Sequence, residues 1–220
     1  MEQVKKSSMN KNFYINSSVV WKGNAENPLP DISFIPSLIR RRLTDIEKIG
    51  LYLANQVCGD KNDYYVVFAS RFGEWGQTIK LIEQFYNDRE MSPAGFSNSV
   101  HNATPGILSV LKHNNYAYTS VAGNDNTIDS ALLEAFCSKK NVLFVYAEEK
   151  MPEIYAEVCD NKNLFGYGCA FLISDIDGKV KINVSSVKNS KNVSFDEIAD
   201  FLENANSKIL KTSFLNIEKV

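Results

Sequence analysis

Histidine and cysteine are scarce in this chain of 220 residues, which has two histidines and four cysteines. The histidines, His101 and His113, are not spaced with the cysteines as zinc ligands are, so we do not expect a zinc site. Because cysteine is among the most buried residue types, we interpret the thiols as free and buried rather than joined in disulfides. They are Cys58, Cys137, Cys159 and Cys169.

Long apolar runs and an excess of one charge are also missing. The chain has 24 Lys and Arg against 26 Asp and Glu, so it has no overall basic field that would attract nucleic acid. No apolar stretch approaches the roughly 20 residues that span a bilayer. The first residues, MEQVKKSSMNKNF, lack the apolar core of a secretory signal, and we therefore expect a cytoplasmic protein.

Several short catalytic and cofactor motifs are absent from the sequence. It contains no GxGxxG, GxxxxGK[ST], HExxH or GxSxG. These are the signatures of dinucleotide, nucleoside triphosphate, zinc protease and hydrolase sites. We therefore expect no cofactor, and few catalytic options remain.

What is present is an alternation of short apolar runs with segments whose apolar residues recur every three or four positions. The runs predict strands at Phe13–Trp21, Tyr64–Ser70, Ala117–Val121, Val142–Ala147, Cys169–Ser174 and Val180–Val184. The recurring positions predict helices over residues 43–57, 75–86, 101–111 and 128–135, and a last helix after Ser194. This order predicts an α/β layered fold with a mostly parallel sheet flanked by helices.

The last third of the chain has two local signals. Asp177-Gly178 lies between two strand-like runs and predicts a hairpin. Ser194 and Glu197 form an S-x-x-E capping box, which predicts the start of a helix. We expect one domain over residues 1–220, irregular at 1–12, with a polar linker and a C-terminal helix within 185–220.

The most unusual segment is SPAGFSNSVHNATPGILS at residues 92–109, which gathers polar side chains before a helix. Free N–H groups at a helix N-terminus can stabilise an oxyanion, so this cluster is a candidate site. The alternative is that its members are ordinary cap and turn residues. A Ser–His or Cys–His dyad through His101 also stays open. The polar members are Ser97, Asn98, Ser99, His101 and Asn102.

A second unusual segment is Arg40-Arg41-Arg42, which precedes the first predicted helix. Cations at a helix start oppose the helix dipole at a cost of roughly 0.3–1 kcal/mol. This placement favours docking of an acidic partner, with a solvated basic turn as the alternative.

Four strings now point to a family. They are RRRLTDIEKIGLYLA at 40–54, VVFASRFGEWGQT at 66–78, SPAGFSNSVHNATPGILSV at 92–110 and VAGNDNTIDSALLEA at 121–135. In this order they resemble the β-ketoacyl synthase-like N-terminal family, of the chain length factor type found in aryl polyene biosynthesis. The resemblance covers about Arg40 to Ile173. SVHNA is its most specific part, followed by ASRFGE.

The resemblance implies a thiolase-like half-fold, with the hairpin and last helix at its C-terminal end. In a full ketoacyl synthase the first half supplies a nucleophilic Cys on a turn at a helix N-terminus, and the second half supplies two histidines. Aligning VAGNDNTIDSA with that turn places Asp125 where the Cys would be, and the sequence ends before a second half. A carboxylate is a poor nucleophile towards a thioester, so we expect no condensation by this chain alone.

The resemblance also implies partners: a catalytic β-ketoacyl synthase in a heterodimer, and an acyl carrier protein. The strand Ala117–Val121 would be the edge that joins the two sheets, since an exposed edge must be paired or protected. Arg40, Arg41 and Arg42 would dock the acidic carrier protein. The residues expected at the shared acyl cavity or interface are Asn98, His101, Asn102, Tyr118, Val121, Asp125 and Asn126.

Two other functions stay open at this point. The chain would be a small acyl-thioester-processing enzyme if His101 were catalytic, and His101 is the weak candidate for that role. It would be a carrier-protein-binding scaffold if it bound acyl chains or carrier protein without changing the chemistry.

Overall fold

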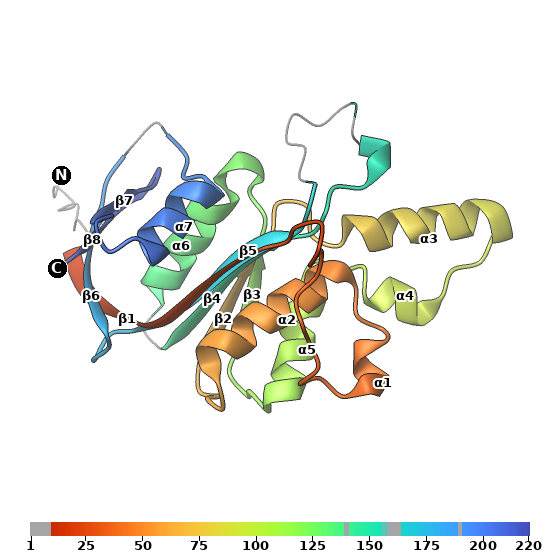
Figure 1. Ribbon diagram of the computed structural model, residues 1–220, viewed down its shortest axis with the longest axis horizontal. Coiled ribbons are helices and arrows are strands. Elements are labelled where there is room, and N and C mark those ends of the chain that lie inside the picture. The colour runs from red at the N-terminus through yellow and green to blue at the C-terminus, as the bar shows by residue number, and fades with distance from the viewer. Residues whose placement is uncertain (1–9, 139–140, 156, 158–163, 189–190) are drawn as a thin grey trace, which may run out of the picture.

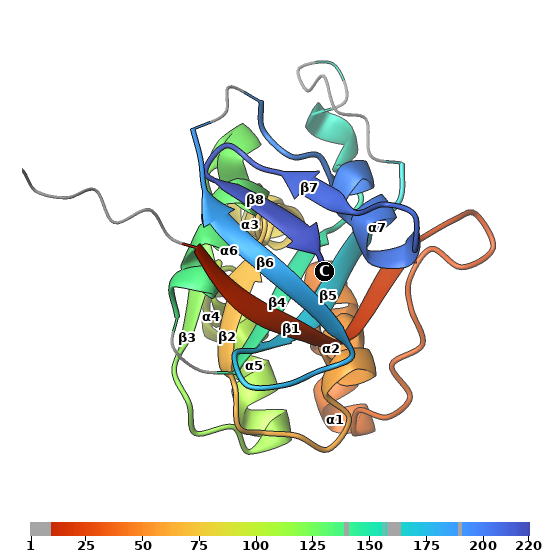
Figure 2. The ribbon, with the colours of Figure 1, turned by 90° about the vertical axis from the view of Figure 1, so that its left-hand side faces the viewer.

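The computed structural model describes residues 10–138, 141–155, 157, 164–188 and 191–220. The described strands form one eight-stranded sheet in the order β3-β2-β4-β5-β1-β6-β8-β7 (Figures 1 and 2). The strands are β1 (Asn10–Lys22), β2 (Tyr65–Ala69), β3 (Tyr118–Val121), β4 (Val142–Glu148), β5 (Tyr167–Ser174), β6 (Val180–Ser186), β7 (Ile209–Lys211) and β8 (Leu215–Lys219).

The helices are α1 (Ser37–Arg40), α2 (Asp45–Cys58), α3 (Trp75–Asp88), α4 (Pro93–Ser97), α5 (Ala103–Lys112), α6 (Thr127–Cys137) and α7 (Phe195–Glu203), with short 3₁₀ turns η1 (Asn124–Asn126) and η2 (Glu153–Tyr155). The five predicted helices are confirmed as α2, α3, α5, α6 and α7, whereas α1 and α4 were not predicted. The predicted capping box before α7 is confirmed, since the Ser194 hydroxyl accepts from the Glu197 N–H and the Glu197 carboxylate accepts from the Ser194 N–H.

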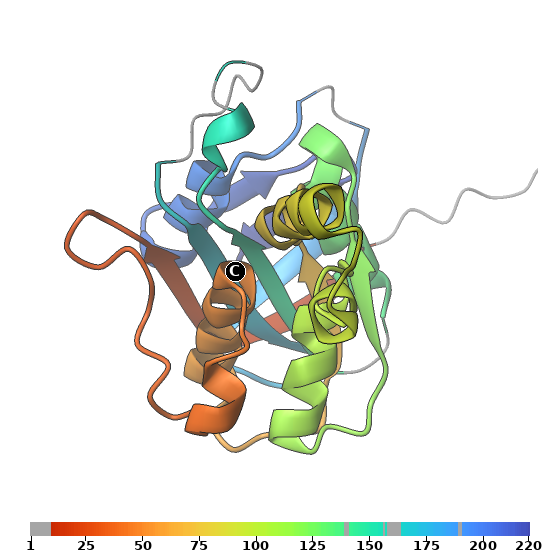
Figure 3. The same cartoon turned by 90° about the vertical axis from the view of Figure 1, so that its right-hand side faces the viewer.

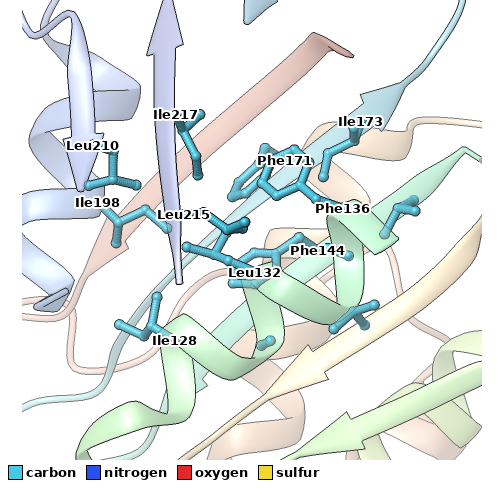
Figure 4. Close-up of a cluster of buried hydrophobic side chains, with 14 of the residues drawn as sticks. Ile128, Leu132, Phe136, Phe144, Phe171, Ile173, Ile198, Leu210, Leu215 and Ile217 are labelled. Carbon is cyan, nitrogen blue, oxygen red and sulfur yellow. The ribbon is translucent and has the colours of Figure 1, made fainter. Parts of the chain in front are cut away.

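Two buried clusters hold helices on opposite faces of the sheet. α6 and α7 pack on one face through residues such as Leu132, Phe136 and Ile198, which meet Phe144 and Phe171 of the strands (Figure 4). On the other face, α2 and α5 cover a second cluster. The predicted α/β layered fold is therefore confirmed.

The prediction of a mostly parallel sheet is wrong, because the sheet is mixed. β2 pairs in parallel with β3 and with β4, whereas β5, β1, β6, β8 and β7 are joined by antiparallel pairs. The apolar runs indicate burial on both faces, which parallel strands commonly have, but burial does not fix strand direction. Direction here follows from long-range pairing with β1, which no local pattern reports.

The predicted hairpin at Asp177-Gly178 is also wrong. β5 and β6 both pair antiparallel with β1 and lie on opposite sides of it, so residues 175–179 cross β1 instead of reversing the chain. Asp177-Gly178 would allow the chain to turn back, but β1 lies between β5 and β6, so these two strands do not pair with each other. A hairpin does occur later, where β7 pairs antiparallel with β8.

The expectations for the chain ends are partly corrected. Residues 10–12 were expected to be irregular but belong to β1, paired with β6, and residues 1–9 lie outside the described residues. The region 185–220 contains the expected helix α7 and two unexpected short strands, β7 and β8. Three to five residues give too short a pattern to predict a strand. The assignment of the chain to one domain stays a prediction.

The sheet has two edges among the described strands, β3 and β7. The prediction that Ala117–Val121 contains an edge strand is thus confirmed. α3 and α4 project away from the body of the protein, at the right of Figure 1. Within the described part of the chain, no helix is long and apolar enough to cross a membrane.

Candidate functional site

The turn after β2 is the first part of the candidate site. Ser70, directly after the strand, is fully buried, and its N–H donates to the carbonyl of Val121 at 3.2 Å. Its hydroxyl accepts from the Gly73 N–H at 2.8 Å. Gly73 has a φ of 58°, a left-handed conformation that glycine adopts readily. The Ser70 hydroxyl therefore holds the two ends of the turn, residues 70 and 73, together.

Glu148, the last residue of β4, holds this turn from the neighbouring strand. Its carboxylate accepts from the Ser70 hydroxyl at 3.0 Å and from the N–H groups of Arg71 and Phe72. Burial raises the pKa of Glu148 to about 7, although these hydrogen bonds oppose the rise. The carboxylate thus fixes the positions of both Ser70 and Arg71.

His101 lies on the opposite side of the same turn. Its Nε2 is 2.8 Å from the carbonyl oxygen of Ser70, and because a carbonyl only accepts, Nε2 carries the proton. The ring meets Phe68 edge-on, with centroids 6.0 Å apart. A Cβ on Gly73 would lie 2.7 Å from the ring atom Cδ2, so the imidazole needs a glycine there.

The two candidate serines of the segment 92–109 make local contacts. Ser97 and Ser99 donate to the carbonyls of Pro93 and Phe96, at 3.0 and 2.9 Å. Asn102 is the N-cap residue of α5 but makes no side-chain cap hydrogen bond. The predicted cluster therefore divides: His101 contacts the β2 turn, whereas the serines act as ordinary turn residues.

The turn from β3 into α6 is the second part of the site. Asn124 has a φ of 51°, and the Thr127 hydroxyl accepts from the Gly123 N–H at 3.0 Å and donates to the Asn124 carbonyl at 2.7 Å. Asn126 is the N-cap residue of α6 but makes no side-chain cap hydrogen bond. Thr127 holds the turn instead.

Asp125 at the tip of this turn pairs with Arg71 of the β2 turn. Asp125 Oδ1 and Arg71 Nη1 are 2.8 Å apart, and the Asp125 side chain is 64% exposed. The Arg71 guanidinium also lies over the Phe72 ring, 4.9 Å from its centroid. Contacts therefore run from His101 through Ser70 and the Glu148-bound turn to Asp125.

A cavity of about 620 Å³ lies beside this ion pair. Its wall consists of the residues following β2, the end of β4, the β3–α6 turn with the start of α6, residues 22–23, residues 164–167 and residues 192–196. Its cations Arg71 and Lys22 are paired, Lys22 with Asp196 at 2.8 Å. Rings of Tyr146 and Phe195 line it together with polar residues such as Asn124, so the wall is mixed, with its cations paired.

Of the residues expected at a shared acyl cavity or interface, one lines this cavity of the single chain. Asp125 lies in the wall. The predicted residues outside the wall are Asn98, His101, Asn102, Tyr118, Val121 and Asn126. The sequence offered one usable signal for the wall, the acidic pair Glu148-Glu149 directly after a buried strand. Phe195 and Tyr167 come from distant segments and carry no such signal.

Buried acids also gather where α2, α3 and the end of β4 meet. Burial, followed by the charge of Glu47, raises the pKa of Glu74 to about 9, and burial raises that of Glu149 to about 7. Glu149 accepts from the Gly76 N–H at 2.8 Å, in the first turn of α3. Among the described residues, no group of three or more His, Cys, Asp or Glu could hold a metal ion.

The three arginines end a helix instead of starting one. Arg40 is in the last turn of α1, where a cation complements the dipole, so the expected unfavourable placement is wrong. Arg41 and Arg42 are exposed, and the Arg42 carbonyl accepts from the Asn98 amide at 3.2 Å. This hydrogen bond joins the arginine segment 40–42 to the polar segment 92–109.

The thiols partly follow expectation. Cys58 and Cys169 are buried and free, whereas Cys137 is free but exposed, and Cys159 lies outside the described residues. Cys137 ends α6, at the opposite end of that helix from Asp125.

Comparisons with solved structures show the fold. A chain of the ketosynthase ApeO in complex with its chain length factor ApeC, from Xenorhabdus doucetiae, aligns with a TM-score of 0.75 at 18% identity, over 94% of this chain and 99% of that one. The ishigamide ketosynthase/chain length factor aligns with a TM-score of 0.53 at 16% identity, over 72% and 52%.

A third structure is a type II polyketide synthase acyl-carrier protein in complex with its ketosynthase bound to the hexaketide. It aligns with a TM-score of 0.61 at 13% identity, over 76% of this chain and 64% of that one. The aligned region thus spans less than two thirds of the second and third structures' chains. The expected thiolase-like half-fold is confirmed.

A search among curated proteins gives no match. A family model described as Beta-ketoacyl synthase, N-terminal domain, matches residues 16–216, a wider range than the resemblance in the sequence covered. The chain therefore belongs to the β-ketoacyl synthase N-terminal domain family.

Proposed function

We propose that this chain is a non-catalytic, chain length factor-like partner of a β-ketoacyl-ACP synthase. In this proposal it acts in aryl polyene or fatty-acid-type polyketide biosynthesis, in the cytoplasm, and shapes the acyl cavity across a heterodimer interface. Two similar structures, each a ketosynthase with a chain length factor, support the partner role.

The observation that carries the proposal is the ion pair between Asp125 and Arg71 at the turn where we expect a synthase to hold its nucleophile. A carboxylate bound to a guanidinium is a weaker nucleophile than a free one, and the synthase needs a thiolate. The histidines do not replace the missing base. His101 donates through Nε2 to Ser70, and His113 caps the far end of α5.

The two sheet edges differ in a way that supports pairing through β3. β7 is only three residues long and is bordered by Lys208 and Lys211, charges that discourage association. β3, Tyr118–Val121, carries neither charge nor proline. An edge without such protection is suited to strand addition.

The remaining assignments belong to the same proposal. Tyr118 and Val121 would lie at the strand junction, and Asn98, His101, Asn102, Asp125 and Asn126 would face the shared acyl cavity. Arg40, Arg41 and Arg42 would dock the carrier protein. None of these arginines forms an ion pair within the described part of the chain, which leaves them available to an acidic surface.

The test is product length in a reconstituted condensation with the β-ketoacyl synthase from the same genome. Asn126 is exposed beside Asp125, and Asn126→Trp adds bulk to the proposed cavity. Overpacking costs about 1–3 kcal/mol, enough to stop elongation within a step or two, so products should shorten while the first condensation continues.

The matched control is Lys179→Trp, an exposed site in the connection between β5 and β6. It should leave the product profile unchanged by mass spectrometry. If Asn126→Trp and further bulky substitutions beside Asp125 also leave it unchanged, the cavity-shaping role is contradicted.

A further inference from the structure

An apolar surface on the projecting part of the chain has no cover in this structure. We define the arm as residues 75–100, which contain α3 and α4. Of the 14 residues of α3, Leu81 alone is buried. The large exposed apolar side chains of the arm are Ile82 (63% exposed), Phe85 (47%), Tyr86 (75%), Met91 (45%), Phe96 (58%) and Val100 (42%).

These side chains form an organised surface. Ile82, Phe85 and Tyr86 are spaced at i, i+3 and i+4, so they share one side of α3. Next to them, Leu81 contacts α4 near Gly95, and the Gln77 amide donates to the Gly95 carbonyl at 3.2 Å. The two helices of the arm are therefore held together by this packing and this hydrogen bond.

A helix with one buried residue gains little from packing within its own chain. Helices of about 12–15 residues are marginal in water without tertiary contacts, and exposed apolar patches of this kind mark interaction sites. The arm thus has the composition of an interface element that is completed by another protein.

The arm leads along the chain to the β3 edge. α4 is followed directly by α5, and Tyr118 of β3 lies over Gly106 of α5. Figure 3 looks along α3 and shows this helix end-on in front of the body of the protein. The arm is therefore joined to the unprotected edge through α5.

The interface area that a stable complex needs indicates that one partner covers both the arm and the β3 edge. A specific interface buries about 800 Å² on each partner, from 20–30 residues a side. β3 has four residues and cannot supply this area alone. The arm offers six further large apolar side chains.

The charges of the arm narrow the kind of partner. It carries Lys80 and Arg89 against Glu83, Asp88 and Glu90, so it has no basic field for an acidic carrier protein. A partner with an apolar, largely uncharged complement fits it better.

We infer that the arm packs against the catalytic ketosynthase and provides most of the apolar contact in the heterodimer. This inference rests on the proposed function. Phe85 and Ile82 are the expected anchors, because large apolar side chains near an interface centre dominate binding.

The test compares variants of the full chain, each co-expressed with the β-ketoacyl synthase from the same genome. Ile82→Glu with Phe85→Glu places two charges on the apolar side of α3. Lys80→Glu with Glu83→Lys, at exposed polar positions of the same helix, is the matched control. Circular dichroism melting checks that each variant folds, and Phe96→Ser on α4 provides a second, independent variant.

We expect the wild-type chain and the control to co-elute with the ketosynthase in size-exclusion chromatography with light scattering. The Ile82/Phe85 variant should bind at least about 30-fold more weakly, and Phe96→Ser should also bind more weakly. If the wild type binds and the folded variants bind equally well, the arm inference is overturned while the proposed function stands.

Failure of the proposed function gives a different result. In that case the wild-type chain itself does not bind the ketosynthase. A homodimer of the wild type that the arm variant dissolves would mean that a second copy is the occupant, and this too overturns the inference.

Discussion

At the scale of single residues, Glu148 connects the parts of the candidate site. This residue is 2% exposed, and its carboxylate accepts from the Ser70 hydroxyl and the Arg71 N–H, so it orients the groups that reach His101 and Asp125. Burial raises its pKa from 4.5 to about 7. The unfolded chain therefore loses this proton at a lower pH than the folded chain does.

This difference predicts a pH dependence of stability. The free energy of unfolding should fall as the pH rises from about 4.5 to about 7, and Glu148 contributes on the order of 3 kcal/mol to the fall. Glu148→Gln should flatten that slope in urea titrations at several pH values. Part of the slope should remain in this variant, because the pKa values of Glu74 and Glu149 are also raised.

Glu197→Gln is the control for this titration. Hydrogen bonds from Lys191 and Ser194 lower the pKa of Glu197, so its stabilising contribution is lost only as the pH falls below about 4.5. This variant should leave the slope between pH 5 and pH 7 as in the wild type. An unchanged slope in Glu148→Gln would contradict the role given to the buried carboxylate.

Gly73 gives a second prediction at the residue scale. Both Gly73 and Gly59 have positive φ, so alanine at either should cost on the order of 1 kcal/mol. At Gly73 the added Cβ also meets the His101 ring, whereas at Gly59 it meets nothing within 4 Å.

The His101 imidazole resonances in NMR should therefore shift in Gly73→Ala and stay in place in Gly59→Ala. Shifts of equal size in both variants would mean that the close packing of glycine and imidazole does not position the ring.

At the scale of elements, the β3 edge decides how the chain associates in this account. The carbonyls of Ala117 and Val121 accept from β2, so by alternation Tyr118 and Ser120 direct their backbone groups to the open edge. Ser120→Pro removes one outward N–H without breaking a bond to β2. Stability should stay within about 1 kcal/mol, while binding to the ketosynthase should fall at least tenfold.

Lys211→Pro provides the matched control at the opposite edge. The Thr212 N–H donates to Leu215, so by the same alternation the Lys211 N–H faces outward from β7. This variant should bind the ketosynthase as the wild type does, in light-scattering measurements. Equal loss of binding in both variants would exclude β3 as the specific junction.

Much at this scale could be predicted from sequence. The helices α2, α3, α5, α6 and α7 follow from apolar spacing and caps, because local periodicity reports which side of a helix is buried. Strand partners depend on contacts far along the chain. The pairing of β1 between β5 and β6, which removes the expected hairpin, had no local signal.

At the scale of the whole molecule, the candidate site was predicted only in part. Asp125 in the β3–α6 turn and His101 in the segment 92–110 both lie in strings that carried the family resemblance, so these two residues could be named. The different partners of these two residues could not be predicted. The ion pair of Asp125 with Arg71 and the hydrogen bond of His101 to Ser70 arise only when β2, β3 and β4 assemble. The aromatic part of the cavity wall, from Tyr167 and Phe195, is likewise a product of tertiary packing.

The central claim is that this chain changes the product of a ketosynthase without condensing acyl groups itself. The most direct measurement is mass spectrometry of the products formed from malonyl and acyl thioesters of the carrier protein. It compares the products of the chain alone, of the ketosynthase alone and of the two together. We predict no condensation by the chain alone and a defined product length only from the pair. Turnover by the isolated chain, or an identical product from the ketosynthase with and without it, would contradict the account.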